Sequence, residues 1–156
     1  MSVRVQREDF DVGRELESLS RGRPGVGAVV SFVGLVRDMV SERPLLALEL
    51  EHYPGMTERE LAAIDAEARR RWPLETVLVI HRYGRLTPGD RIVLVAVASA
   101  HRNAAFEACQ FLIDWLKTRA PFWKSEETTA GSHWVEAKAA DDAAAARWGA
   151  PEITCG

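Results

Sequence analysis

Residues 99–126, SAHRNAAFEACQFLIDWLKTRAPFWKSE, decide the expected fold because they place an apolar helix between two groups of basic side chains. Apolar residues recur at helical spacing along this stretch, at Phe106, Cys109, Ile113 and Leu116. Asn103 is the expected N-cap, and the helix should stop before Pro121, whose ring cannot continue it. Lys124, which follows the proline, is therefore expected on a loop.

A continuous apolar run, residues 92–98 (IVLVAVA), precedes this helix and follows a Pro-Gly-Asp turn, so it predicts a buried strand. Further strands are expected at residues 3–6, 27–36, 45–51, 76–80 and 133–138, and further helices at 9–19, 57–71 and 141–148. The elements alternate between strand pairs and helices, without a Gly-rich phosphate loop or an internal repeat. This order predicts an α+β protein with a mixed sheet.

The composition bounds the class of protein. The chain has 156 residues, of which 47% are hydrophobic, so we expect one domain over residues 1–150 and a short tail at 151–156. A net charge of -3 argues against bulk binding of nucleic acid, and no apolar run is long enough for a membrane span, so a cytoplasmic protein is expected. Cys109 and Cys155 form neither a disulfide framework nor a zinc pattern, and Cys109 is expected as a buried core thiol.

Candidate functional residues are basic and stand where core strands end or beside the central helix. They are Arg37, His101, Arg102, Lys117 and Lys124. Such a set suits a multiply anionic small substrate, an oxyanion that develops during a reaction, and proton transfer by a lysine. No serine or cysteine has the surroundings of an activated nucleophile, so a nucleophile would come from elsewhere. Each cation taken alone is equally compatible with a solvated surface charge, and His81 is expected to be a hydrogen-bonded structural histidine.

Three stretches resemble the MoaE family, the large catalytic subunit of molybdopterin synthase. They are GAVVSFVGLVRD at 27–38, LELEHYPGM at 48–56 and AHRNAAFEACQFLIDWLKTRAPFWK at 100–124, within a resemblance that covers about residues 25–148. The resemblance implies an α+β fold with mixed and antiparallel sheets of the α/β-hammerhead type. It also implies a homodimer that binds two small ubiquitin-like sulfur-carrier subunits, MoaD-like, in a heterotetramer.

The resemblance further implies the reaction. The C-terminal Gly-Gly thiocarboxylate of the small subunit supplies sulfur, and two transfers convert cyclic pyranopterin monophosphate into the dithiolene of molybdopterin. No cofactor, metal, nucleic acid or membrane partner is implied.

Residue roles carry over by motif position. Lys117 and Lys124 correspond to the family's catalytic lysines. Substrate-contacting positions correspond to Leu35, Val36, Arg37, His101, Arg102, Lys117, Lys124, Ser125 and Glu126. Some relatives carry a basic residue where this chain has Leu35, so only backbone contacts are expected from Leu35 and Val36. Arg147 is a candidate for a basic residue that the partner subunit contributes.

Two other functions fit the cations without the motif match. One is a lysine-assisted acyl or phosphoryl transferase that needs no carrier protein, and it would turn over as an isolated chain. The other is an anion-binding module or scaffold without enzymatic activity, in which loss of Lys117 weakens binding alone.

Overall fold

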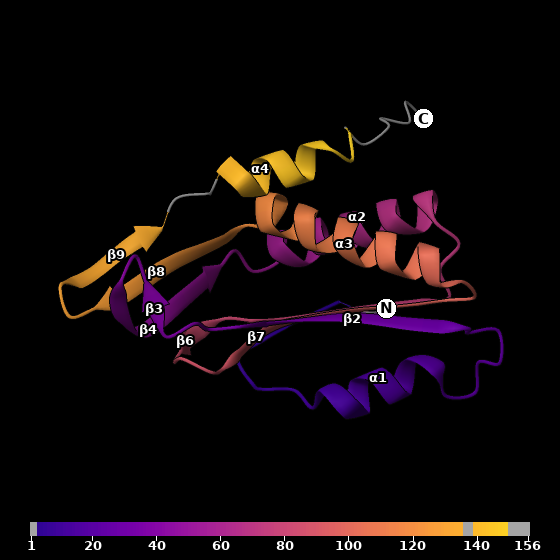
Figure 1. The fold of residues 1–156 in the computed structure, drawn as a ribbon, viewed down its shortest axis with the longest axis horizontal. Coiled ribbons are helices and arrows are strands. Elements are labelled where there is room, and N and C mark those ends of the chain that lie inside the picture. The colour runs from indigo at the N-terminus through magenta and orange to yellow at the C-terminus, as the bar shows by residue number, and fades with distance from the viewer. Residues whose placement is uncertain (1–2, 136–138, 150–156) are drawn as a thin grey trace.

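The computed structural model describes residues 3–135 and 139–149 (Figure 1). The end of the strand predicted at 133–138, the predicted tail and Cys155 lie outside the described residues. The elements in chain order are β1 (Val3–Gln6), α1 (Val12–Ser20), β2 (Ala28–Leu35), β3 (Met39–Val40), β4 (Arg43–His52), α2 (Met56–Arg71), β5 (Thr76–Arg82), β6 (Gly84–Leu86), β7 (Arg91–Ser99), α3 (Arg102–Arg119), β8 (Phe122–Thr128), β9 (Gly131–Val135) and α4 (Ala139–Ala146).

The first sheet has the strand order β1-β5-β7-β2. Strand β1 pairs with β5 in parallel, whereas β5 and β2 pair with β7 in antiparallel fashion, so the sheet is mixed as predicted. Helix α1 covers one face, and α2 and α3 cover the other (Figure 1).

Strand β7 is apolar from residue 92 to residue 98 because both of its faces are buried. Val93, Val95 and Val97 pack toward α2 and α3, whereas Leu94, Ala96 and Ala98 join the core cluster that contains Phe10 and Leu19 on the α1 side. A strand buried on both faces has no position for an alternating polar residue. The predicted strand at 92–98 is confirmed.

The second sheet has the order β3-β4-β8-β9, and β6 also pairs with β4. It has its own core cluster, made of Val36, Leu45, Leu48, Leu50 and Leu86. In Figure 1 this sheet lies beyond the end of α3, beside the end of the first sheet from which β7 starts. Helices together with one mixed and one antiparallel sheet confirm the α+β class.

Two local predictions around α3 are wrong. The helix begins at Arg102, and His101 occupies the N-cap position two residues before the predicted Asn103. The carbonyl of His101 already accepts the first helical bond, from the N–H of Ala105 at 3.3 Å. Lys124 lies on β8 and not on a loop. Pro121 does end the helix, but the chain turns at once into β8, where Lys124 pairs with Leu50 of β4.

Gly27 generates a testable prediction about how the chain enters α3. Its N–H donates to the carbonyl of Ser99 at 2.9 Å, and a Cβ at this position would lie 2.2 Å from the carbonyl oxygen of Ala100. We expect Gly27→Ala to lower the free energy of unfolding by about 3 kcal/mol, measured by urea denaturation, because two backbone segments must move apart.

Gly13→Ala is the matched control for this change. Gly13 lies in α1, and a Cβ there would have its nearest neighbour, Asp11 Oδ1, at 3.4 Å. Its stability should equal or slightly exceed that of the wild type, because alanine favours the helix. Equal stabilities for both variants would contradict the steric argument.

Candidate functional site

The two predicted catalytic lysines lie at the same end of the first sheet. Lys117 is exposed in the last turn of α3, and Lys124 is half-buried on β8. The positive charges of both lysines act on His81 at the end of β5 and help to lower its pKa. Lys117 and Lys124 thus both lie near His81.

Three aromatic rings contact one another at this end of the molecule, those of His52, His81 and Phe122. The ring of Phe122 stacks on His81 with centroids 3.7 Å apart and an interplanar angle of 17°, and it lies 6.1 Å from the ring of His52 in a tilted arrangement. The Nδ1 atom of His52 lies 3.2 Å from the hydroxyl of Thr57, which itself donates to the carbonyl of Tyr53. Since that hydroxyl proton is used, His52 Nδ1–H is the donor to Thr57.

His81 is held neutral. Burial lowers its pKa to about 4; the hydrogen bond to Arg82 opposes this, and the charges of Lys117 and Lys124 add to the lowering. Its side chain is only 5% exposed, and its Nδ1–H donates to the carbonyl of Arg82 at 2.8 Å. The prediction of a hydrogen-bonded structural histidine is confirmed.

Strand alternation separates Ser125 from Glu126. Lys124 and Glu126 share one face of β8, because alternate residues of a strand point the same way, and they pair with Leu50 and Leu48 of β4. Ser125 points to the opposite face. The carboxylate of Glu126 is largely buried and lies 3.8 Å from His133 Nε2.

The end of β2 presents Leu35, Val36 and Arg37. Leu35 is 54% exposed and pairs with Arg91 at the start of β7, so these residues lie at the same end of the first sheet as His81. Val36 is buried, its N–H donates to Asp90, and its carbonyl accepts from Gly89. The carbonyl oxygen of Val36 keeps a second lone pair, which can accept a hydrogen bond from a ligand. Arg37 is exposed between β2 and β3.

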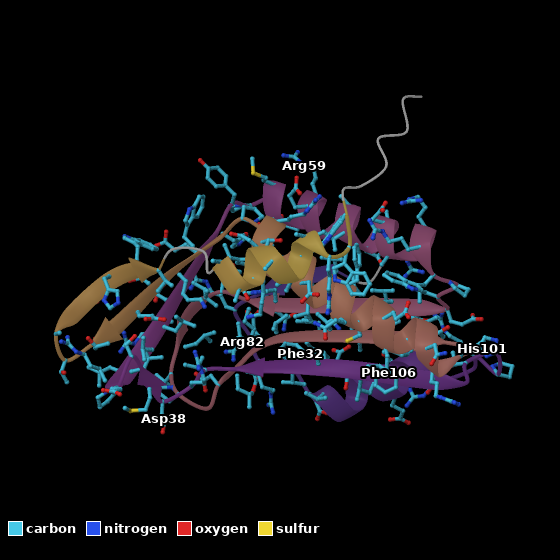
Figure 2. All side chains as sticks on the ribbon, turned by 45° about the horizontal axis from the view of Figure 1, so that its top comes forward. Phe32, Asp38, Arg59, Arg82, His101 and Phe106 are labelled. Atoms are coloured by element: carbon cyan, nitrogen blue, oxygen red, sulfur yellow. The ribbon has the colours of Figure 1, made fainter. Side chains whose placement is uncertain are left out.

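His101 and Arg102 lie at the other end of the molecule. Both are exposed at the start of α3, whereas Lys117 lies in the last turn of the same helix. Fifteen residues of helix separate Arg102 from Lys117 by about 22 Å. Figure 2 labels His101 and Asp38, the neighbour of Arg37, near opposite ends of the view. The predicted site residues therefore do not all lie together within one chain.

Arg147 is engaged inside its own chain. It donates to Asp114 on α3 at 2.9 Å, and Trp148 Nε1 donates to the same buried carboxylate at 2.7 Å.

Burial raises the pKa of Cys109 to about 11, which confirms the predicted core thiol. Over the part of the chain that the structure describes, no three His, Cys, Asp or Glu side chains are grouped as a metal site. Nor does any helix within residues 3–135 and 139–149 combine the length and apolarity needed to cross a membrane.

These features define a class: an α+β protein in which two lysines lie near a buried histidine where two sheets meet. Comparison with known proteins gives the family. The profile described as "MoaE protein" matches residues 5–119. The molybdopterin synthase catalytic subunit of Mesorhizobium japonicum is 60% identical over 149 residues, which cover 94% of this chain and 92% of that protein. The chain belongs to the MoaE family.

Solved structures agree. A molybdopterin biosynthesis MoaE protein from Burkholderia ambifaria superposes with a TM-score of 0.82 at 51% identity, covering 96% of this chain and 98% of that one. A chain in the complex of subunits 1 and 2 of the molybdopterin-converting factor from Helicobacter pylori has a TM-score of 0.71 at 18% identity, covering 86% and 90%, and shares the fold.

Sequence reasoning did not assign His52 and Phe122 to the site. Both stand inside the motifs HYPGM and FWK that carry the family resemblance, and this was the available signal. Their pairing across β4 and β8 joins residues 70 positions apart, and no local pattern reports such a contact.

The neutral state of His81 predicts a pH dependence of stability. The unfolded histidine titrates near 6.5 and the folded one near 4, so between these values the unfolded state binds more protons. We expect this group to reduce the free energy of unfolding by about 3 kcal/mol as the pH falls through that window.

Urea denaturation at several pH values between 7 and 4 measures the effect in the wild type and in His81→Phe. The variant lacks the titrating group, so its stability should fall less steeply with acid. Identical slopes would show that His81 is not held neutral by the fold.

Proposed function

We propose that this chain is the catalytic subunit of a molybdopterin synthase. It transfers sulfur from the thiocarboxylated C-terminus of a small ubiquitin-like subunit to cyclic pyranopterin monophosphate, forming the dithiolene of molybdopterin. The observation that carries the proposal is that Lys117 and Lys124 both lie near the buried His81 in a member of the MoaE family. The relative from Mesorhizobium japonicum bears the name of this subunit.

The use of lysine supports amine chemistry at this site. Of the 20 Lys and Arg residues in the chain only three are lysines, namely Lys117, Lys124 and Lys138. A guanidinium stays protonated at working pH, whereas an amine can exchange its proton. An ammonium group can also stabilise negative charge that develops on an oxygen during the transfer.

An external sulfur source agrees with the chemistry of the described thiol. Cys109 is buried, and its raised pKa keeps it protonated and unreactive. The Helicobacter pylori structure is a complex of two different subunits of the molybdopterin-converting factor. For this chain we propose a similar small partner, whose C-terminal segment reaches the lysine pair.

A homodimer would complete the site. Arg102 lies about 22 Å from Lys117, too far for one small anion to contact both within a single chain. Strand β2 is an edge strand, and it exposes Val29, Phe32 and Leu35. Apolar edges of this kind pair readily with another chain. A second copy on this edge would bring its own His101 and Arg102 to the substrate.

Lys117→Ala tests the catalytic role. Without the ammonium group, dithiolene formation should be abolished while fold and oligomeric state stay intact, because Lys117 is exposed and forms no part of the core. The assay mixes purified chain with cyclic pyranopterin monophosphate, with and without thiocarboxylated small subunit, and measures molybdopterin. A near-normal single-turnover rate in the variant would remove Lys117 from the mechanism.

The wild type in the same assay decides among functions. Product only with the carrier supports the synthase. Product without the carrier would identify a different transferase, and no product with a carrier proven on another large subunit would leave an anion-binding module.

Mixing variants tests the shared site. Arg102→Ala should weaken pterin binding by about 1.5 to 3 kcal/mol if the guanidinium makes a charged hydrogen bond. When Arg102→Ala is mixed with Lys117→Ala and the subunits exchange, about half of the dimers contain one chain of each variant. One of the two sites in each mixed dimer then has both residues intact. About a quarter of the wild-type activity should therefore return at low pterin concentration.

The matched control mixes Lys117→Ala with Lys124→Ala. Both lysines belong to the same chain's site, so exchange should restore nothing. If the Arg102→Ala mixture also gains no activity, Arg102 does not act across a dimer.

A further inference from the structure

Helix α3 and strand β8 are joined by only two residues, Ala120 and Pro121. The Ala120 carbonyl accepts from the N–H of Phe122 at 2.8 Å, so the chain makes a tight local turn and Phe122 opens the new strand. Lys117 lies three residues before this junction and Lys124 three residues after it. The position of Phe122 therefore governs how the two lysines are placed relative to each other.

Phe122 is held by a residue from the other sheet. His81 belongs to β5 of the first sheet, and Phe122 belongs to β8 of the second. Their rings are nearly parallel at 3.7 Å. Phe122 and Lys124 share one face of β8, because they are two residues apart in a strand. A shift of the Phe122 ring would be transmitted directly to Lys124.

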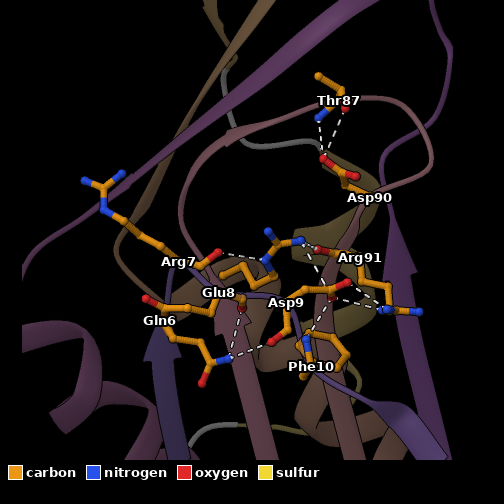
Figure 3. A network of polar contacts seen from close by, with 9 residues as sticks. Gln6, Arg7, Glu8, Asp9, Phe10, Thr87, Asp90 and Arg91 are labelled. Atoms are coloured by element: carbon orange, nitrogen blue, oxygen red, sulfur yellow. Dashed lines mark hydrogen bonds and ion pairs between the residues drawn. The ribbon is translucent and has the colours of Figure 1, made fainter.

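The ring of His81 is itself fixed by its hydrogen bond to Arg82. The side chain of Arg82 is tied on two sides, since Nε donates to the carbonyl of Arg7 at 3.0 Å and a terminal nitrogen donates to the carbonyl of Arg91 at 2.9 Å. Asp9 binds Arg91 at 2.7 Å and lies 3.8 Å from Arg82 (Figure 3). This network joins the ends of β1 and β5 to the start of β7, so the carbonyl that orients His81 has little freedom.

We propose that His81 is a positioning residue for the lysine pair: its ring, stacked flat on Phe122, holds the α3–β8 junction so that Lys117 and Lys124 face one substrate. The inference rests on the proposed function for its kinetic consequence, but the geometry it asserts can be tested on the chain alone. Because His81 stays neutral, the stack adds no third positive charge beside the lysines.

Two substitutions at His81 separate the ring from the hydrogen bond. His81→Asn keeps an N–H donor for the Arg82 carbonyl but removes the stacked ring, whereas His81→Phe keeps a flat ring and removes the donor. With carrier and pterin, His81→Asn should lower kcat about ten- to hundredfold and change KM for the pterin less than about threefold, since misplaced groups lose rate more than binding. His81→Phe should retain kcat within about threefold of the wild type.

A second readout needs no activity. The chain has three lysines, so a short amine-reactive crosslinker gives few products, and mass spectrometry can quantify the Lys117–Lys124 link. The yield of this link should fall in His81→Asn and persist in His81→Phe. If the wild type makes no molybdopterin, the proposed function fails while the crosslinking result still decides the positioning role.

Val79→Ala is the matched control, since Val79 is a buried residue of the same strand whose cluster includes Val95 but not Phe122. It should lose stability while keeping kcat and the crosslink. If His81→Asn does not fold, Phe122→Leu and Phe122→Tyr repeat the comparison from the other side of the stack. The proposal is overturned if His81→Asn or Phe122→Leu keeps kcat and the crosslink, if His81→Phe loses as much as His81→Asn, or if Val79→Ala loses equally.

Discussion

Burial of β7 on both faces is the constraint on which the rest of the structure depends. The backbone of this strand is paired with β5 on one side and β2 on the other, and residues 94–98 have no solvent exposure. Both faces must be covered to remove their apolar side chains from water, so α1 packs on one face and α2 with α3 on the other. Because α3 follows β7 after a short turn, it runs back along the strand and carries Lys117 to the end where β7 begins.

The functional end of the molecule is built at the limit of that first sheet. There α3 ends and β8 begins as part of the second sheet. This sheet has a separate core that contains Leu48, Leu50 and neighbouring residues. Cations in the last turn of α3 are favoured by the negative end of the helix dipole. His81 tolerates the lysines because it is uncharged, and its ring links the two sheets through Phe122. Stability and the placement of the charged groups thus depend on the same contact.

The predictions that succeeded rest on local patterns. Apolar periodicity identified α3, and the continuous β-branched run identified β7 as a buried strand. The predictions that failed concern partners far away in sequence. Lys124 was expected on a loop because Pro121 gives a stop signal, and nothing near it reports that residues 122–128 pair with β4, some 75 residues earlier. The same reason explains why Phe122 and His52 were not assigned to the site.

The sequence by itself determined the α+β class, the central strand and helix, the set of cationic residues and the family, since composition, periodicity and motifs are local and survive without coordinates. Only the tertiary structure decided which of those residues meet. It gathers Lys117, Lys124 and the end of β2 at one end of the first sheet and leaves His101 and Arg102 at the other end of α3. The physical reason is that an 18-residue helix is a rigid rod: its length keeps its two ends apart, and strand pairing across the chain selects what each end faces.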